Sequence, residues 1–445
     1  MTLDILEKAQ KMLEEYPLCN HCLGRQFGLL GYGVENEERG QALKLLLTMK
    51  AHQQTTAGDK NGPALLKTLA SNGDFQIAND ILKKTENKTA KSQSCCLCDG
   101  KLESSERSVK VALAKLKEYE YNTFLVGIEL PPEIEEREDE FKGKFAIEYG
   151  ESLRNEFSRV IGKRIAEATG KATEYGRPEL VVLVNPFNKE LRLQINPIFI
   201  SGRYRKLSRG IPQSRWLCRS CRGKGCKQCS WTGKLYPDSV EEIIGYPLLE
   251  MSRGEEYALH GAGREDIDAR MLGRGRPFVI EGKKPKKRFL DLKNLRERIN
   301  EKAEGKVEVS SLSFADKDVV RKLKKSEAAQ KLYRVIVEVD KPVSQKQLTL
   351  LQKALVGATV EQQTPQRVMH RRADMIREKY IYMANVKRLA PNRFEMRIKC
   401  QGGLYIKELI NGDQGRTKPS VSEILDAKAV PSELDVLGVY MEEEA

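Results

Sequence analysis

Residues 263–278 read Gly-Arg-Glu-Asp-Ile-Asp-Ala-Arg-Met-Leu-Gly-Arg-Gly-Arg-Pro-Phe, and the rest of the chain is interpreted outward from them. The stretch places Asp266 shortly after a Gly-Arg step, in a loop-like segment with further arginines. Glycine permits tight turns, and nearby cations favour the ionised form of a carboxylate. Because exposed ion pairs add little stability, this arrangement predicts a nucleophile in a site that receives a polyanion. The tetrapeptide alone favours the alternative, a solvated charged loop.

The stretch resembles the Gly-Arg-x-Asp motif of pseudouridine synthases. Its extended form, through Phe278, resembles the archaeal and eukaryotic family that makes pseudouridines 54 and 55 in the T-loop of tRNA. This resemblance covers nearly the whole chain. It implies that Asp266 is the nucleophile of a tRNA pseudouridine synthase, and it leaves open whether uridine 54, uridine 55 or both are modified. Asp268 is the internal rival, but only Asp266 follows Gly-Arg-x directly.

The same resemblance assigns substrate contacts to two later segments. Tyr333 is expected against the target base, with a hydroxyl that helps to remove the C5 proton. In the segment Gly-Leu-Tyr-Ile-Lys, Tyr405 is expected near the substrate, Ile406 on the base, and Lys407 paired with Asp266. From its placement, Arg264 is expected to contact phosphate or to help displace the base. Without the resemblance, Tyr333 is interpreted as a core side chain and the later segment as an amphipathic turn.

Two basic segments are candidates for RNA contacts. Residues 201–210 are predicted to form a loop with four cations and a tyrosine, and residues 366–372 form a second basic stretch. Cations neutralise phosphates, and a tyrosine ring offers a stacking surface. The passage up to residue 210 resembles the THUMP module of tRNA-modifying enzymes. The predicted RNA-binding residues are Arg203, Arg205, Lys206, Arg209, Arg367, Arg371 and Arg372; solvated charged loops are the alternative.

Eight of the ten cysteines fall into Cys-x-x-Cys pairs, a spacing that lets two thiolates bind one tetrahedral ion. One predicted quartet is compact, and the other brings together two pairs that lie far apart in the sequence. The compact set is Cys218, Cys221, Cys226 and Cys229, and the split set is Cys19, Cys22, Cys95 and Cys98. Neither set leaves an open coordination position, so we expect one or two structural zinc ions and no organic cofactor. Cys400 is interpreted as core filler.

The 445 residues carry a net charge of +14, which predicts an anionic partner, here tRNA. The first residues lack the pattern of a signal peptide, and no apolar run approaches the length of a membrane span. We therefore expect a cytoplasmic protein without membrane contact. The sequence does not indicate the oligomeric state.

An α+β fold is predicted: an N-terminal zinc-stapled, THUMP-containing accessory domain, then a pseudouridine synthase domain on a mostly antiparallel sheet with flanking helices. The expected parts are a helical region (1–106), a THUMP-like module (107–215), a zinc knuckle (216–235) and the catalytic domain (236–445). Periodicity predicts helices over 151–169 and 290–302. It predicts strands over 109–113, 122–128, 179–184, 191–195, 239–245, 277–281, 331–339, 380–389 and 393–400.

Other RNA-modifying activities and a non-catalytic role are the alternatives to this function. A methyltransferase or a sulfur-transfer enzyme would need a glycine-rich nucleotide-binding loop, and the sequence offers no convincing example. A non-catalytic, zinc-containing tRNA-binding or chaperone-like protein is the remaining alternative, because the compact quartet resembles one zinc repeat of a chaperone family. That family uses several such repeats, whereas this chain has one compact copy.

Overall fold

The computed structural model describes residues 4–188, 190–325 and 329–440, with the side chain of Arg371 outside the description. The chain divides into two compact units, Met1–Asn196 and Pro197–Ala445. The four-part division expected from the sequence stays a prediction, although its second part reaches past the boundary at Asn196. Among the residues described, no helix combines the length and hydrophobicity that crossing a bilayer requires.

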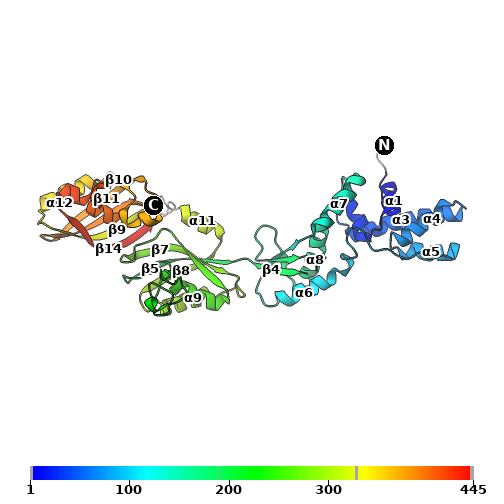
Figure 1. Ribbon diagram of the computed structural model, residues 1–445, viewed down its shortest axis with the longest axis horizontal. Coiled ribbons are helices and arrows are strands. Elements are labelled where there is room, and N and C mark those ends of the chain that lie inside the picture. The colour runs from blue at the N-terminus through cyan, green and yellow to red at the C-terminus, as the bar shows by residue number, and fades with distance from the viewer. Residues whose placement is uncertain (1–3, 189, 326–328, 441–445) are drawn as a thin grey trace. The chain divides into compact units, whose positions relative to one another are not determined.

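The first unit contains a four-stranded sheet of order β2-β1-β3-β4, in which β1 is parallel to both neighbours and β3 and β4 form an antiparallel pair. The strands are β1 (Thr123–Ile128), β2 (Ala172–Thr173), β3 (Leu180–Val184) and β4 (Leu191–Ile195). The α-helices are α1 (Ile5–Glu15), α2 (Asn20–Gly24), α3 (Asn36–Thr56), α4 (Asn61–Ser71), α5 (Gln76–Glu86), α6 (Glu106–Leu116), α7 (Pro132–Lys144) and α8 (Leu153–Thr169). Helices α6 and α8 pack against each other and against this sheet (Figure 1). The strands predicted over 122–128, 179–184 and 191–195 and the helix predicted over 151–169 are confirmed.

One hydrophobic core joins the N-terminal helices to the sheet, since residues as distant in sequence as Leu13 and Phe157 belong to the same buried cluster. Polar contacts reinforce this connection. The buried Arg25 guanidinium pairs with Glu138, and His21 Nδ1 lies 2.8 Å from Glu156 Oε1. The expected helical region and the part of the expected THUMP-like module up to Asn196 therefore form one unit.

The second unit is built on a ten-stranded, mostly antiparallel sheet of order β13-β10-β11-β12-β9-β14-β7-β5-β8, with β6 paired to β7. Its strands are β5 (Ile198–Lys206), β6 (Glu256–Gly261), β7 (Arg270–Lys283), β8 (Val307–Ala315), β9 (Gln330–Val339), β10 (Thr359–Gln363), β11 (Ile376–Ala390), β12 (Arg393–Gln401), β13 (Thr417–Lys418) and β14 (Ala429–Tyr440). Its α-helices are α9 (Val240–Ser252), α10 (Leu292–Lys302), α11 (Lys317–Lys325), α12 (Gln345–Leu355), α13 (Ile406–Asn411) and α14 (Val421–Leu425). The predicted helix over 290–302 is confirmed, as are the strands at 277–281, 331–339, 380–389 and 393–400.

Strand β14 connects the two halves of this sheet. It pairs antiparallel with β9 on one side and parallel with β7 on the other, where Asp435 faces Arg270 and Val436 faces Met271. Each half has its own buried cluster. Cys400 belongs to the cluster around β9–β12, so its interpretation as core filler is confirmed.

Two predicted strands are helices instead. Residues 109–113 lie in α6, where Val109, Ala112 and Leu116 are buried at helical spacing. Residues 239–245 begin α9, where the Ser239 hydroxyl accepts from the amide of Glu242 at 3.2 Å. Both predictions were wrong because five to seven residues are too few to separate the two periods. A Ser followed three residues later by Glu is a helix-start signal that identifies α9.

The basic segment at 201–210 was predicted to be a loop, and that prediction was also wrong. Its first half completes strand β5, which alternates buried Ile200 and Tyr204 with more exposed residues and ends at buried Lys206. The strand lies between β7 and β8. The cations at alternate positions obscured the period of two that defines a strand.

Candidate functional site

A pocket of about 410 Å³ in the second unit brings together side chains from widely separated segments. The lining includes the loop between β6 and β7, strand β9, the turn η5 (Gln366–Arg371), and the segment that leads into α13. Every predicted catalytic and substrate-contact residue lies on its wall: Arg264, Asp266, Tyr333, Tyr405, Ile406 and Lys407, together with Arg367 and Arg372 from the predicted RNA-binding set.

Buried and half-buried side chains hold the backbone of the loop that carries Asp266 through hydrogen bonds to its carbonyl oxygens. Lys206 Nζ donates to the carbonyl oxygens of Asp266 at 3.0 Å and Ile267 at 3.2 Å, and Gln213 Nε2 donates to that of Gly263 at 3.0 Å. Burial lowers the pKa of Lys206 to about 8. The prediction that Lys206 contacts RNA is therefore corrected, because this buried ammonium holds the loop instead.

A buried polar cluster lies directly behind the same loop. Glu265 accepts from the Tyr204 hydroxyl at 2.9 Å and from Arg276 Nε at 2.8 Å, and Arg276 Nη1 donates to Ala262 O at 2.6 Å. Burial, followed by the charge of Glu265, raises the pKa of Tyr204, so this residue donates as a neutral phenol. Sequence reasoning missed the cluster, because a Glu next to an Asp in a charged loop gives no sign of which one is buried.

The carboxylate of Asp266 is held by two cations. Arg367 Nη1 lies 3.2 Å from Oδ1, and Lys407 Nζ lies 3.5 Å from Oδ2. Lys407 is closer to Asp268, at 2.6 Å, and Arg367 Nε also donates to the buried Glu408 at 2.6 Å. Burial raises the pKa of Asp268, but the hydrogen bond and charge of Lys407 outweigh it and lower that pKa. The expected pairing of Lys407 with Asp266 is thus shared with Asp268, and Arg367 is the nearer partner.

Aromatic and apolar side chains complete the pocket. Tyr333 on β9 is half-buried, and burial raises its pKa well above the usual range. Ile406 is buried at the start of α13. The Tyr405 ring has the guanidinium carbons of Arg367 and Arg372 within 6.0 Å of its centroid, a distance at which cations interact favourably with a ring face.

The remaining predicted contacts lie outside this lining or beyond the description. Arg203 donates to Gly275 O at 3.2 Å, and Arg205 pairs with Glu308. Arg209 Nη2 lies 2.7 Å from Asp435 Oδ1, so part of its charge is used within the fold. The side chain of Arg371 lies outside the described residues.

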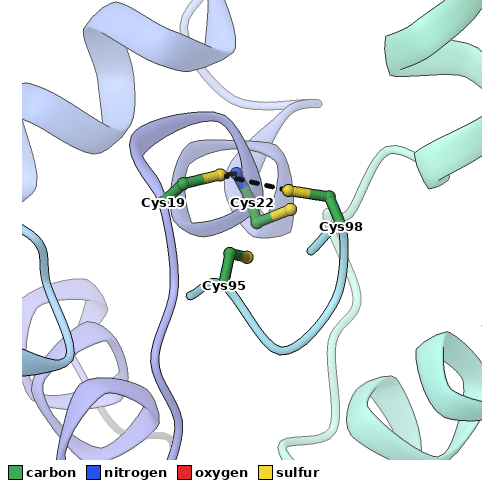
Figure 2. Close-up of side chains that lie close together, drawn as sticks. All are labelled: Cys19, Cys22, Cys95 and Cys98. Carbon is green, nitrogen blue, oxygen red and sulfur yellow. Dashed lines mark hydrogen bonds between the residues drawn. The ribbon is translucent and has the colours of Figure 1, made fainter. Parts of the chain in front are cut away.

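Both predicted cysteine quartets come together in space, and in each the four sulfur atoms lie within 4.8 Å of one another. In the split quartet, α2 presents Cys22 and its N-terminal cap Cys19, while a turn supplies Cys95 and Cys98 (Figure 2). Cys19 Sγ and Cys98 Sγ are 3.6 Å apart. The described sulfur pairs of the compact quartet lie at 3.7 to 3.9 Å. Each set could hold a metal ion.

The family models and the curated relatives that match this chain name the same family. The family model described as "Pus10, C-terminal" matches residues 199–440, and the one described as "Pus10 THUMP domain, archaeal" matches residues 109–185. The chain is 45% identical to the tRNA pseudouridine synthase Pus10 of Methanocaldococcus jannaschii, over 97% of this chain and 93% of the relative. It is 40% identical to the proteins of the same name from Methanothrix thermoacetophila, over 98% of this chain and 94% of that one, and Thermofilum pendens, over 98% and 95%.

Proposed function

Since this chain belongs to the Pus10 family of tRNA pseudouridine synthases, we propose that it isomerises a T-loop uridine of tRNA, at position 54, 55 or both, with Asp266 as the nucleophile. One observation carries the proposal. The pocket places the Asp266 carboxylate, the Tyr333 ring and the apolar side chain of Ile406 around one cavity, although their segments lie far apart in the sequence.

The reaction breaks the N1–C1′ bond of the nucleotide, turns the detached uracil within the pocket, and forms a C5–C1′ bond. The proton at C5 then leaves and N1 is protonated, so reactant and product are isomers and electrons balance without an external oxidant or reductant. The Asp266 carboxylate attacks C1′ as N1 leaves with the bonding electrons, and C5 of the turned uracil then displaces the carboxylate from C1′, which regenerates Asp266. Before the attack, Arg367 and Lys407 stabilise its negative charge and hold its orientation. The target base must leave its stack to reach this carboxylate.

Tyr333 receives a narrower role than the sequence suggested. Because burial raises its pKa, its hydroxyl is protonated in the free enzyme, and little phenolate is present to act as a base. We assign the ring to stacking on the extruded uracil and the hydroxyl to hydrogen bonding. Removal of the C5 proton by Tyr333 would require the bound substrate to lower the pKa of its hydroxyl.

RNA contacts are assigned to the cations at the rim. Arg372 and Arg264 line the pocket, and Arg264 also lies 5.5 Å from the ring centroid of Trp216, which lines an adjoining pocket. Arg203, Arg205, Arg209 and Arg371 stay predictions for more distant phosphates. In the first unit, the THUMP-like module is assigned to tRNA binding on the family match alone.

The first prediction tests the reaction and its position. An unmodified tRNA transcript incubated with the purified protein is expected to gain pseudouridine in the T-loop, because the pocket holds one set of catalytic groups and recognises an extruded uridine. Sequencing after pseudouridine-specific chemical modification identifies the position. A transcript with uridine 54 replaced by cytidine, and another with uridine 55 replaced, separate the two sites. Absence of product in every transcript under conditions in which the protein binds tRNA contradicts the proposal.

We also propose that each quartet binds one structural zinc ion. A tetrahedral ion with Zn–S bonds of about 2.3 Å requires sulfur atoms about 3.8 Å apart. One sulfur pair of the split quartet lies at 3.6 Å and three pairs of the compact quartet at 3.7 to 3.9 Å, close to that value, and the sulfur atoms of each quartet all lie within 4.8 Å of one another. In the split quartet the ion would link α2 to the turn at Cys95 and Cys98. It would thus connect the two ends of the segment that contains α3, α4 and α5.

Metal analysis by mass spectrometry checks the zinc assignment. Wild-type protein is expected to carry about two zinc ions per chain, and Cys95→Ser or Cys226→Ser about one, because three thiolates hold the ion less firmly. Loss of an ion should lower folding stability rather than remove the chemistry selectively. A single ion in the wild type, unaffected by one of the two substitutions, would show that the quartet carrying that substitution is empty.

A further inference from the structure

Two lysines on the wall of the catalytic pocket have no role in the chemistry described above. Lys331 lies on β9 and Lys379 on β11, and both line the cavity that Asp266 faces. Asp266 is held by Arg367 and Lys407 instead. Among residues 4–188, 190–325 and 329–440, no carboxylate forms an ion pair with either lysine, and each side chain is half-buried.

A glycine makes room for each of these lysines. Gly263 has a φ of +82°, and a Cβ added there would lie 3.0 Å from Lys331 Nζ. Gly403 has a φ of +94°, and a Cβ there would lie 3.1 Å from Lys379 Cε and 3.4 Å from Nζ. Gly263 begins the segment that carries Asp266, and Gly403 begins the one that carries Tyr405 and Lys407. Each catalytic segment therefore starts with a bare α-carbon on which a lysine packs.

Charges of both signs surround Lys331, with Arg276 and Lys379 among the cations and Glu265 among the anions. Burial, followed by the charge of Arg276, lowers its pKa to about 8, and Lys379 acts in the same direction. Cys400 lies opposite Lys331 in the pairing of β12 with β9, and burial raises the pKa of its thiol. Glu265 is already bound by Arg276 and Tyr204. An ammonium in such a place is costly in the free enzyme, and an anion that enters the pocket removes that cost.

We propose that Lys331 and Lys379 bind a phosphodiester group of the extruded nucleotide, so that the enzyme binds the target through its backbone phosphate while the Tyr333 ring stacks on its base. The inference rests on the proposed function of this pocket. Lys331 and Tyr333 are two residues apart on β9, so they face the same side of the sheet, about 7 Å apart along the strand. A uracil against the Tyr333 ring then leaves its own sugar–phosphate within reach of the ammonium groups.

A phosphate fits this pair better than the base does. Uracil is neutral and presents two carbonyl oxygens, which cannot offset two neighbouring positive charges. A phosphodiester carries a full negative charge with oxygens directed outward, and a lysine ammonium binds it as a compact point charge. The pair thus recognises what every nucleotide shares, and the groups around Asp266 recognise what is particular to uridine.

The test is a thermodynamic cycle between one lysine and one phosphate. T-arm stem-loop RNAs are made with a neutral methylphosphonate at each of the linkages flanking the target uridine, one at a time. Their affinities are measured at fixed salt for the wild type, Lys331→Gln and Lys379→Gln. Lys346→Gln is the matched control, because this exposed lysine on α12 undergoes the same change of charge outside the pocket.

We expect one linkage at which the methylphosphonate weakens wild-type binding about three- to tenfold, and Lys331→Gln to weaken binding to unmodified RNA by a similar factor. Combining the two changes should add little further loss. The slope of log affinity against log salt should fall by about 0.7 to 0.9 for each lysine variant. Lys346→Gln should add its effect independently at every linkage.

Additive losses at every linkage for both pocket lysines would overturn the inference, as would unchanged affinity of the wild type for every methylphosphonate RNA. The second result uses only wild-type protein, so it does not depend on whether a variant folds. Pseudouridine formation by the wild type is assayed separately. If the wild type forms no pseudouridine, the proposed function itself is wrong. If it forms pseudouridine while the losses are additive, only the proposed role of the two lysines is wrong.

Discussion

Asp266→Asn is expected to reduce pseudouridine formation by about 10³-fold or more, because it removes the proposed nucleophile while preserving its shape. The amide oxygen can still accept from Arg367, which lies 3.2 Å away in the wild type, so the pocket keeps its geometry. The rate is measured in single turnovers, as release of the C5 hydrogen from RNA that carries tritium at C5 of uridine.

Asp268→Asn is the matched control, because it makes the same change two residues away on the same loop. It removes the partner that lies 2.6 Å from Lys407, and leaves that lysine to Asp266 alone. We expect a rate loss of less than about tenfold, since exposed pairs contribute little. Affinity for tRNA should be nearly the same for both variants. If the two losses were exchanged, Asp268 would be the nucleophile and the assignment of Asp266 would be wrong.

Arg276→Met is expected to destabilise the second unit by about 3–5 kcal/mol, because it leaves the buried Glu265 carboxylate without its cationic partner. The side chains of both residues are almost fully inaccessible, at 1% and 0% exposure, and only the Tyr204 and Arg276 groups offer hydrogen bonds to that carboxylate in the described contacts. The same substitution frees Ala262 O, so the loop before Asp266 also loses support.

The measurement is urea unfolding followed by tryptophan fluorescence. The sequence contains two tryptophans, Trp216 and Trp231, both in the second unit, so the signal of the full chain reports this unit. Arg274→Met, an exposed change on the same strand, should cost less than about 1 kcal/mol. Adding Glu265→Gln to Arg276→Met should recover part of the loss, because the buried charge is then gone. No recovery would mean that Arg276 stabilises by packing rather than by charge.

The candidate catalytic groups were predictable because they lie in short segments that resemble a known family. Asp266, Tyr333 and Lys407 were each identified that way, and the pocket brings them together. The pattern of supporting contacts was not predictable. Whether Lys206 faces RNA or the interior depends on the strand β5 to which it belongs, and that strand was interpreted as a loop.

Ion pairs between distant segments could not be predicted from the sequence for a related reason. Arg367 was predicted to follow an RNA backbone, but the turn η5 places it between Asp266 and Glu408. No local pattern encodes a pairing between residues 101 positions apart. The secondary-structure errors at α6 and α9 had a different cause, since in both cases the apolar residues of a short window fit two periods.

Strand β14 joins the two halves of the sheet that the proposed site spans, so we expect this site to form only after residues 429–440 have been synthesised. Asp266 belongs to the half of the sheet that contains β7, and Tyr333 lies on β9 in the other half, with β14 between them. Residues 429–440 leave the ribosome after every other described element, whereas N-terminal units generally fold first. We therefore expect a nascent chain to complete its first unit before the pocket around Asp266 and Tyr333 forms.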